Sequence, residues 1–407
     1  MKKKAPLRFT PAAATLFMGA GALSLVAAVV SSPAPAFQAS LQGLRLWWQI
    51  VFPALLPFLV LSEMLIAYGW IHALGTWLEP LMNRLFKLPG IGGWVLAMGM
   101  TTGFPGGAQA ARQLHEQGAL SAEEASKLAA LSHFCNPMLI LIVIATGLMH
   151  DPATGYILLA VHWITGLSAF LLLGEGRAAS KGGTGRDLPV KKPLKQEKGS
   201  FVYRSLQSAK RAHAMDGRSF GRLLGDSVTN AVQTLMMVGG YIIIFAVVIQ
   251  IVSRIVSGFF PSYWLSGLFE IHLGAKDAAA AGFASDRMQW SVISALLGFS
   301  GISAILQSMS ALKKANTRRL RFVLIRLLHG ALAFAATWII WPLCYLLPEN
   351  TSQVFSSRGD LPADASGWFS LWQAVPQLLR WQGAVLAAML VCSLLLMLLQ
   401  IRRKHSR

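Results

Sequence analysis

Two motifs rich in glycine and hydroxyl side chains interrupt apolar segments of this sequence. The segment Thr101 to Gly107 follows an apolar run from Trp94 to Met100, and Ser300 to Ser303 lies inside the apolar run from Trp290 to Ser310. Backbone that is not helical at membrane depth must be buried in protein or line a water-filled cavity, where its free amides can bind a solute. A half-helix that begins after such a break also points its amides and the positive end of its dipole at the cavity. These motifs therefore predict recognition of a small anionic solute.

The candidate solute-binding residues come from these two motifs and from a third break at Asn136-Pro137. Glycine lets a solute approach the backbone closely, whereas Thr, Ser, Asn and Gln add neutral hydrogen bonds. The alternative is structural, with glycines that permit close helix packing and hydroxyls that satisfy nearby backbone groups. The predicted substrate-binding residues are Thr101, Thr102, Gly103, Gly106, Gly107, Gln109, Asn136, Ser300, Gly301 and Ser303.

Several ionisable residues lie in or beside the apolar segments, namely Glu63, Glu79, Glu270, Arg112 and His133. An ionisable side chain inside a membrane is a functional candidate by default. For Glu79 and Arg112, a position at the membrane interface is the simpler interpretation. A histidine such as His133 can couple transport to protons, but we expect it to end a helix at the water boundary.

No motif supports catalysis. The string Gly217-Arg218-Ser219-Phe220-Gly221 matches a hydrolase nucleophile elbow, but that elbow needs a preceding strand and this string lies in a basic segment without one. A phosphate-binding loop and a His-Glu-x-x-His motif are both missing from the sequence. We expect a protein that is not an enzyme, with no catalytic residues, no cofactor, no metal site and no ATP drive of its own.

The elements that must position these residues are transmembrane helices. The 407 residues are 54% hydrophobic and 13% charged, with a mean hydropathy of +0.53, whereas soluble proteins carry about 25% charged residues. At about 20 residues a span, the length allows roughly eight to ten spans. The predicted fold class is all-α: a polytopic transmembrane helix bundle with interrupted or re-entrant helices and two loosely related halves.

The predicted organisation has five parts. The apolar run from Pro11 to Val30 is longer than a cleaved signal, so we expect an uncleaved first span although Ala34-Pro35-Ala36 resembles a signal-peptidase site. The expected parts are an N-terminal transmembrane segment (1–35), a first membrane half (36–174), a basic cytoplasmic linker (175–226), a second membrane half (227–346), and an external loop with a C-terminal transmembrane segment (347–407).

The net charge of +19 lies in short basic runs beside apolar segments. Basic runs of this kind follow the positive-inside rule, so the partner is the lipid bilayer and no nucleic acid is expected. The rule places the N-terminus, the linker, the cluster near Lys313 and the C-terminal tail in the cytoplasm, and the loop near Asp360 outside.

The two halves share a short likeness. Gly103-Phe104-Pro105-Gly106 and Gly298-Phe299-Ser300-Gly301 agree at three of four positions, and paired interruptions are the best sequence pointer to a transporter site. A strictly inverted second half would place the Lys313 cluster outside, against its charge. Either one re-entrant segment spans the membrane, or the repeats are not simply inverted.

Many short strings, in order, resemble the YlbJ family of sporulation integral membrane proteins. The strings are Phe37 to Leu41, Gly43-Leu44, Trp47-Trp48, Val51 to Phe58, Leu78 to Met82, Pro89 to Gly93, Met98 to Met100, Gly103 to Ala108 and Asn136-Pro137. This family resembles proteins with the nucleoside-recognition Gate domain, which are related to concentrative nucleoside transporters. Some members carry a lysine where Gln109 stands here, and Arg112, on the same helix face, is then the candidate for that charge.

The resemblance implies a role in spore formation and movement of dipicolinic acid across the outer forespore membrane. The resulting hypothesis is a multi-pass membrane protein that acts as a secondary transporter or facilitator and moves a small anionic solute, with dipicolinate as the predicted substrate. A nucleoside carrier is the alternative within transport. A non-transporting membrane scaffold for spore assembly, acting through the basic linker, is the alternative in another class.

Overall fold

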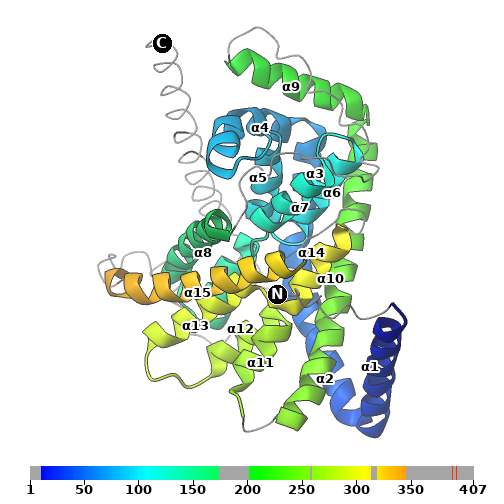
Figure 1. Cartoon of the computed structure of the whole chain (residues 1–407), viewed down its shortest axis with the longest axis vertical. Coiled ribbons are helices and arrows are strands. Elements are labelled where there is room, and N and C mark those ends of the chain that lie inside the picture. Colours follow the sequence, from blue (N-terminus) through cyan, green and yellow to red (C-terminus); the bar gives the residue numbers. More distant parts are fainter. Residues whose placement is uncertain are drawn as a thin grey trace, which may run out of the picture.

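The computed structural model describes residues 11–173, 201–256, 259–312 and 319–344, with two isolated positions at 387 and 391. Within these ranges the chain is helical almost throughout and contains no strand, so the predicted all-α class is confirmed. The long helix α10 runs along the long axis of the molecule, and α15 runs across it (Figure 1). The two helices therefore cannot both stand upright in a bilayer.

The N-terminal elements form a bent helix pair, α1 and α2, and two helices that follow it, η1 and α3. These elements are α1 (Pro11–Ser31), α2 (Pro33–Leu46), the π-helix η1 (Trp47–Val51) and α3 (Phe52–Ala67). The pair α1 and α2 is bent by 106° where they meet. Apolar side chains such as Leu23 and Val30 on α1 are exposed, as expected of a lipid-facing helix. Trp47 of η1 holds these helices against α10, because its indole Nε1 donates a hydrogen bond of 2.9 Å to the carbonyl oxygen of Leu235.

The rest of the first half is a run of short helices that ends in one long helix. It consists of α4 (Trp70–Leu81), the π-helix η2 (Met82–Phe86), α5 (Gly92–Thr102), α6 (Gly106–Glu116), α7 (Ala122–Leu131), the π-helix η3 (Leu139–Leu148) and α8 (Pro152–Leu173). Ser121 and Glu124 form a capping box at the start of α7, as their spacing predicts.

A helix that the sequence assigns to the linker packs on the first half. This is α9 (Phe201–Asp216), which lies against α4, where Gly69 turns the chain with a φ of 76° beside Ala209. Arg218 stabilises the corner between α9 and α10: it donates two hydrogen bonds, of 2.7 and 2.8 Å, to the carboxylate of Asp216 and lies 3.2 Å from the carboxylate of Asp226. The second part of the predicted linker is thus helical, and α10 already starts at Phe220; residues 174–200 lie outside the described part.

The second half repeats the pattern of short helices followed by a long one. It comprises α10 (Phe220–Val256), α11 (Ser262–Phe269), α12 (Ile271–Ala280), α13 (Asp286–Phe299), α14 (Gly301–Ala311) and α15 (Arg319–Cys344). The 37 residues of α10 correspond to about 55 Å at 1.5 Å per residue, far more than the ~30 Å core of a bilayer. This helix must therefore tilt or project from the membrane.

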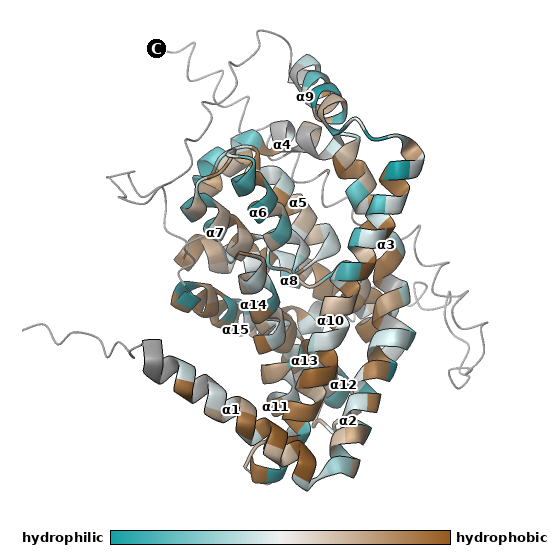
Figure 2. Cartoon of the chain, turned by 90° about the vertical axis from the view of Figure 1, so that its right-hand side faces the viewer, coloured by the Kyte–Doolittle hydropathy of each residue, from teal (hydrophilic) through white to brown (hydrophobic). Residues whose placement is uncertain are grey.

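Four helices in the described ranges are long and apolar enough to cross a membrane, or five if the bent pair α1 and α2 is one span. They are 152–173, 220–256, 286–311 and 319–342. The hydrophilic residues gather on α6, α7 and α9, away from the apolar lower part of α10 (Figure 2). The predicted C-terminal span, the Lys313 cluster and the loop near Asp360 lie mostly or wholly outside the described residues.

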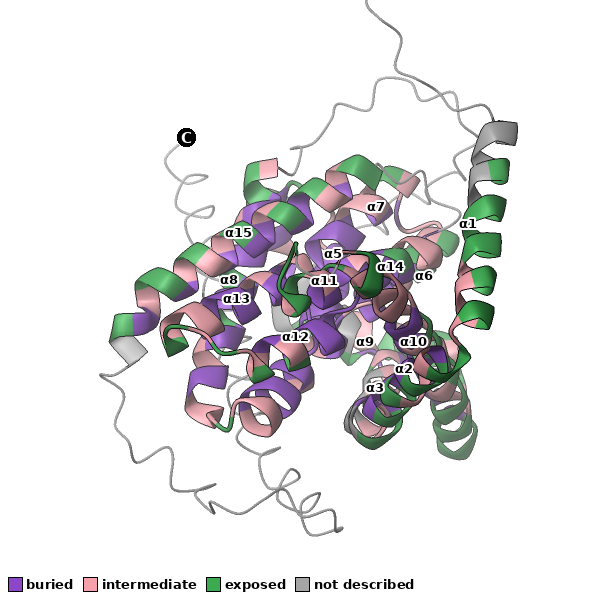
Figure 3. Ribbon diagram, turned by 90° about the horizontal axis from the view of Figure 1, so that it is seen from below, coloured by how far each residue is buried: buried purple, intermediate pink, exposed green. Residues whose placement is uncertain are grey.

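The two halves share one core. Residues of α5, α7, η3 and α8 pack with residues of α12, α13 and α15 in a single buried cluster. Buried residues gather on these central helices, whereas α1 is exposed along most of its length (Figure 3). Glycines let α13 and α15 pack backbone to backbone in this core, since a Cβ on Gly298 of α13 would lie 2.7 Å from the Cα of Gly330 on α15.

Candidate solute-binding site

Each half contains a helical hairpin followed by an interrupted helix. In the first half α5 and α6 pack on each other, and α7 and η3 form the interrupted helix; in the second half α11 and α12 pack on each other, and α13 and α14 form the interrupted helix. The interruption predicted from the sequence is therefore present in both halves. A long helix, α8 or α15, closes each set.

The first hairpin tip lies against the first interruption. Gly103 ends α5 with a φ of 73°, and Phe104 donates a backbone hydrogen bond of 2.9 Å to the carbonyl oxygen of Phe134. A Cβ on Gly103 would lie 2.6 Å from the backbone nitrogen of Asn136. Only glycine combines this positive φ with such close approach, which explains the motif at this tip.

The second hairpin tip lies against the second interruption. Ser300 adopts a left-handed conformation with a φ of 72°, and Gly301, with a φ of 79°, starts α14. A Cβ on Gly301 would lie 3.2 Å from the carbonyl oxygen of Phe269 and 3.3 Å from the amide nitrogen of Glu270, both at the tip between α11 and α12. In both halves, backbone therefore packs on backbone where a hairpin meets a broken helix.

The two Gly-Phe-x-Gly strings are not structural counterparts, and their pairing from sequence is wrong. The string at Gly103 forms the tip of a hairpin, whereas the string at Gly298 passes through the break of a single candidate span, Asp286–Ala311. The counterpart of Gly103 by order is the tip at Glu270, which contains no glycine. A four-residue likeness reports a break but not whether the chain folds back there or continues along the same axis.

The two interruptions meet at the interface of the halves. Cys135, in the first break, donates a hydrogen bond from Sγ to the carbonyl oxygen of Leu297, one turn before the second break, at 3.4 Å. His133 Nδ1 lies 2.9 Å from Ser308 Oγ on α14, and its ring stacks on Phe104 with centroids 5.1 Å apart. Helices α6 and α14, which both begin at a glycine, are also in contact. Residues far apart in sequence thus form one region.

The hydroxyl side chains of the predicted set hold local backbone in this conformation. Thr101 and Thr102 donate to the carbonyl oxygens of Ala97 and Met98, each at 2.8 Å. Ser300 donates to the carbonyl oxygen of Leu297 at 3.0 Å. These bonds match the structural alternative, although each oxygen can still accept a further hydrogen bond.

The amide side chains nearby are also engaged. Asn136 donates from Nδ2 to the carbonyl oxygen of Thr102 at 3.1 Å, and its Oδ1 accepts from the amide of Met138 at 2.6 Å. Ser303 accepts from Gln307 at 3.1 Å, Gly107 packs against Ser132, and Gln109 on α6 is half-buried. The predicted residues therefore shape the two breaks and the start of the half-helices.

Arg326 is the residue that sequence reasoning missed. It is fully buried on α15 and donates from Nη1 to the carbonyl oxygen of His133 at 2.5 Å and from Nη2 to that of Ala130 at 3.2 Å. These carbonyls belong to the C-terminal end of α7 and to the break after it, where a cation stabilises the negative end of the helix dipole. An arginine four residues into an apolar run was a visible signal, because a charge there needs a partner inside the protein.

Three buried histidines surround this arginine. Arg326 Nη1 donates to His329 Nδ1 at 3.1 Å, which leaves His329 Nε2 to donate to the carbonyl oxygen of His162 at 2.8 Å. His162 Nε2 in turn accepts from the amide of Cys135 at 2.9 Å. His133 is only 2% exposed, so its expected place at the water boundary is wrong. Packing of α15 across the break buries it.

Some polar atoms of this cluster have no partner among the described residues. They are Arg326 Nε, His133 Nε2 and His162 Nδ1. Buried polar atoms are almost always hydrogen-bonded, so each of these atoms calls for an explanation, such as an ordered water or a bound ion. The meeting point of the breaks is therefore the best candidate site.

Two of the acidic candidates, Glu270 and Glu63, have structural partners. Glu270, 1% exposed, accepts from the amide of Leu273 at 2.9 Å and from His272 Nδ1 at 2.7 Å, so its carboxylate caps the N-terminus of α12. Glu63 accepts from Asn230 at 2.7 Å. Glu270 shows that a half-helix N-terminus in this region holds a carboxylate, which is the chemistry predicted for the solute.

Comparison with known proteins gives one relative along most of the chain and one family model over part of it. The sporulation integral membrane protein YlbJ of Bacillus subtilis (strain 168) is 35% identical over 385 residues, which cover 89% of this chain and 92% of the relative. The chain belongs to the YlbJ family. The model of the Gate family, described as nucleoside recognition, matches residues 48–149 of this YlbJ-family protein. That match contains the first hairpin and the first interrupted helix. No solved structure gives a significant match.

The YlbJ relationship makes this chain an integral membrane protein of the sporulation type with a Gate segment. Its apolar helices place it in a lipid bilayer. Family and Gate segment together favour a transporter-like protein or a scaffold over an enzyme.

Proposed function

We propose that this YlbJ-family protein is a secondary transporter or facilitator that moves a small anionic solute, dipicolinate, across the outer forespore membrane. The observation that carries the proposal is the meeting of two interrupted helices from the two halves, through Cys135 and Leu297 and through His133 and Ser308. In transporter folds built from two repeats, solute sites lie where such discontinuous helices meet.

The chemistry of this region suits a carboxylate. Helices α6 and α14 begin at Gly106 and Gly301, and the first amides of a helix have no acceptor within it. Each end is worth roughly 0.3–1 kcal/mol to an anion, and up to about 2 kcal/mol when partly buried. Two ends facing one dianion would favour it over a neutral ring by roughly tenfold, at about 1.4 kcal/mol per factor of ten.

The arginine cluster adds a positive charge beside the breaks. Arg326 donates only to carbonyl oxygens and to a histidine in the described part of the chain, so it has no carboxylate partner there. The one carboxylate at these tips, Glu270, is itself held by α12 and His272. We propose that Thr102, Asn136, Ser300 and Ser303 add neutral hydrogen bonds when the breaks open around a solute.

A nucleoside carrier is the second candidate, because the Gate family is described as nucleoside recognition. Uptake of labelled dipicolinate into proteoliposomes that carry the full chain separates the two. Excess dipicolinate or another aromatic dicarboxylate should block this uptake, and excess uridine should not. Saturable uridine uptake that dicarboxylates do not block would replace the anion proposal with the nucleoside one.

A scaffold would work through the basic linker instead. Deletion of residues 175–200 should leave dipicolinate flux largely intact in a carrier, because the deleted segment lies between the two membrane halves. Normal sporulation without any measurable flux in the full chain, together with failure on linker deletion, would favour the scaffold.

A further inference from the structure

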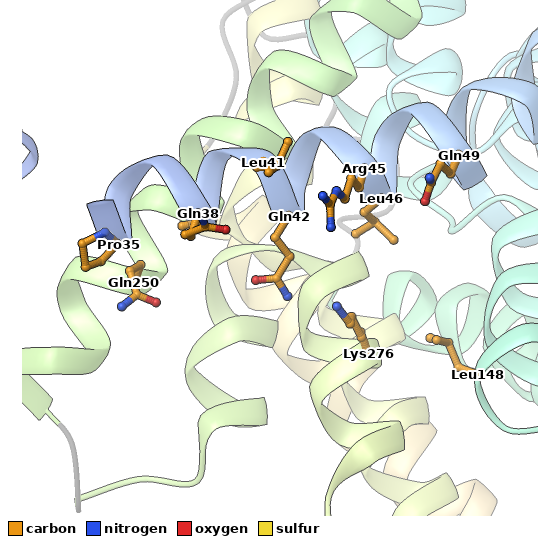
Figure 4. Close-up of a pocket in the computed structure, with 11 residues that line it drawn as sticks. Pro35, Gln38, Leu41, Gln42, Arg45, Leu46, Gln49, Leu148, Gln250 and Lys276 are labelled. Carbon is orange, nitrogen blue, oxygen red and sulfur yellow. The ribbon is translucent and has the colours of Figure 1, made fainter. Parts of the chain in front are cut away.

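A cavity with a mixed polar and apolar lining, separate from the breaks, lies between α2, α10, α12 and η3. Its volume is about 500 Å³, within the ~300–1,000 Å³ range of small-molecule sites. Figure 4 shows the polar face of α2 on one side and Lys276 of α12 on the other. The polar residues that line it are Gln38, Gln42, Arg45, Gln49, Gln250 and Lys276.

Two cations face this cavity and no carboxylate does. Arg45 and Lys276 point toward each other across it in Figure 4, and none of the residues that line it is acidic. Neither cation has an ion-pair partner among the residues the structure describes. Asp277, next in sequence to Lys276, is held instead by Ser266 of α11, which donates to it at 2.5 Å. Like charges that converge on one space without an acid favour an anion between them.

The neutral residues fit the same ligand. Glutamine amides donate hydrogen bonds to carboxylate oxygens. Gln38 and Gln42 lie on α2 and Gln49 lies on η1, which continues α2, so the spacing 38, 42, 45 and 49 places all three on one helix face with Arg45. This helix is held firmly, because Gly43 approaches the backbone of Ile243 on α10, where a Cβ would lie 3.1 Å from the Cα. The backbone that carries this face is therefore fixed against α10.

The cavity lies against two helices that start close to the breaks, namely α12, which starts at the hairpin tip at Glu270, and η3, which follows the break at Asn136. Lys276 stands six residues after Glu270 on α12, about 9 Å along the helix at 1.5 Å per residue. Leu148, which also lines the cavity, is the last residue of η3, the helix that follows the break at Asn136. An anion in the cavity would thus sit on an approach to the proposed transport site.

We propose that this cavity, with Arg45 and Lys276, binds a small organic dicarboxylate and acts as an access site for the anion that the breaks transport. The identity of the ligand rests on the proposed function. The cationic cavity is an independent observation. The headgroup phosphate of an anionic lipid has related chemistry and is distinguished in the experiment below.

A cysteine in place of Gln42 reports occupancy of the cavity. The full chain with Gln42→Cys is reconstituted in nanodiscs of zwitterionic lipid, and the rate of its reaction with a thiol reagent is measured after subtraction of the rate for the parent chain. Dipicolinate should slow the reaction, whereas the uncharged pyridine-2,6-dicarboxamide should not. Arg45→Gln or Lys276→Gln should weaken this protection by roughly fivefold each, or about 1 kcal/mol. Arg222→Gln, a matched loss of an exposed charge on α10, should not weaken it.

The outcomes separate this proposal from the proposed function. If the protein transports dipicolinate but dipicolinate gives no protection, the cavity proposal is overturned and the transport proposal stands. Protection without transport supports the cavity and rejects the transport proposal. Equal protection by the dicarboxamide, or protection unchanged by both charge replacements, overturns the role of the cations. Protection by added phosphatidylglycerol alone also overturns the proposal and assigns the cavity to a lipid headgroup. Gel filtration of each variant checks that it is folded.

Discussion

Substitution of Gly301 at the second break and of Gly106 at the first hairpin tip tests the link between close packing and transport. Gly301 has a φ of 79°, a conformation that costs a non-glycine residue about 1–2 kcal/mol. The Cβ of Gly301→Ala would also press on Phe269 and Glu270, whose nearest atoms are backbone at 3.2 and 3.3 Å. Backbone cannot rotate away, so the hairpin tip must shift.

The first hairpin tip offers a contrasting case. A Cβ on Gly106 would lie 2.2 Å from Oγ1 of Thr102, which is a side-chain atom. The threonine can rotate, but it then gives up its 2.8 Å hydrogen bond to the carbonyl oxygen of Met98, at a cost of about 0.5–1.5 kcal/mol. Trimming with Thr102→Ala should relieve the collision in part, because the Cβ of Thr102 lies farther away, at 3.1 Å.

The assay is initial dipicolinate flux into proteoliposomes with equal amounts of each variant. Gly301→Ala should reduce flux by roughly five- to thirtyfold, the factor that corresponds to 1–2 kcal/mol, and Gly301→Leu should abolish it. Gly106→Ala should reduce flux less, and the double variant with Thr102→Ala should lose less than the two single variants predict together. Gly240→Ala is the control, since nothing lies within 4 Å of its Cβ position.

Two results would refute the reasoning. Flux of Gly301→Ala equal to that of the parent chain would show that contact between the hairpin tip and the break is not needed for transport. Additive losses for Gly106→Ala and Thr102→Ala would show that their collision is not the cause. Reduced membrane levels of Gly240→Ala would point to a general sensitivity of this protein to substitution.

Three further predictions concern parts of the fold around the site. Arg326→Met should lower the free energy of unfolding by about 2–4 kcal/mol. Two buried carbonyls lose their donor, at about 1–3 kcal/mol each, and removal of the buried charge offsets part of this loss. The fraction of protein that stays monodisperse in gel filtration after heating should fall, and it should fall less in Arg326→Lys, which can keep one hydrogen bond. Gly239→Ala should loosen α10 from the indole of Trp47, whose ring lies 2.5 Å from the Cβ position, and increase protease cleavage near α2, whereas the same change at the next, open position should not. The hydrogen bonds from Arg218 lower the pKa of Asp216. This ion pair therefore stabilises the α9 corner fully at pH values above the ordinary aspartate pKa of about 3.9, and the stabilisation is lost as pH falls through the lowered pKa. Protection of α9 from hydrogen exchange should fall more steeply below about pH 4 in the parent chain than in Asp216→Asn, and identical profiles would contradict this.

The membrane class and the breaks are local properties, and the sequence predicts both. Few charges and long apolar runs leave a chain no means of covering a water-facing surface. Glycine, proline and Asn136-Pro137 end helices through their own backbone preferences, so the breaks at Gly103, Ser132–Pro137 and Ser300 follow without knowledge of any partner. The capping box at Ser121 is predictable for the same reason.

The roles of the individual side chains depend on contacts that no local pattern contains. The hydroxyls of Thr101 and Thr102 bond to their own helix, whereas Asn136 bridges to a carbonyl 34 residues away. His133, expected at the water boundary, is buried because Arg326 and Ser308 contact it, although they follow it in the sequence by 193 and 175 residues. Such pairs form only when the halves pack together.

The sequence by itself determined that this is a polytopic helical membrane protein whose helices break at glycine and proline motifs, because composition and backbone preference act within a few residues; its resemblance to the YlbJ family rests on matching strings along the chain. Only the tertiary structure decided that Gly103 belongs to a hairpin tip and Ser300 to an interrupted span, that the two breaks meet through Cys135, and that Arg45 and Lys276 face one cavity. The physical reason is that a break requires only the local φ and ψ values, whereas its direction and its neighbours are set by the burial of whole helix faces, which a short motif does not encode.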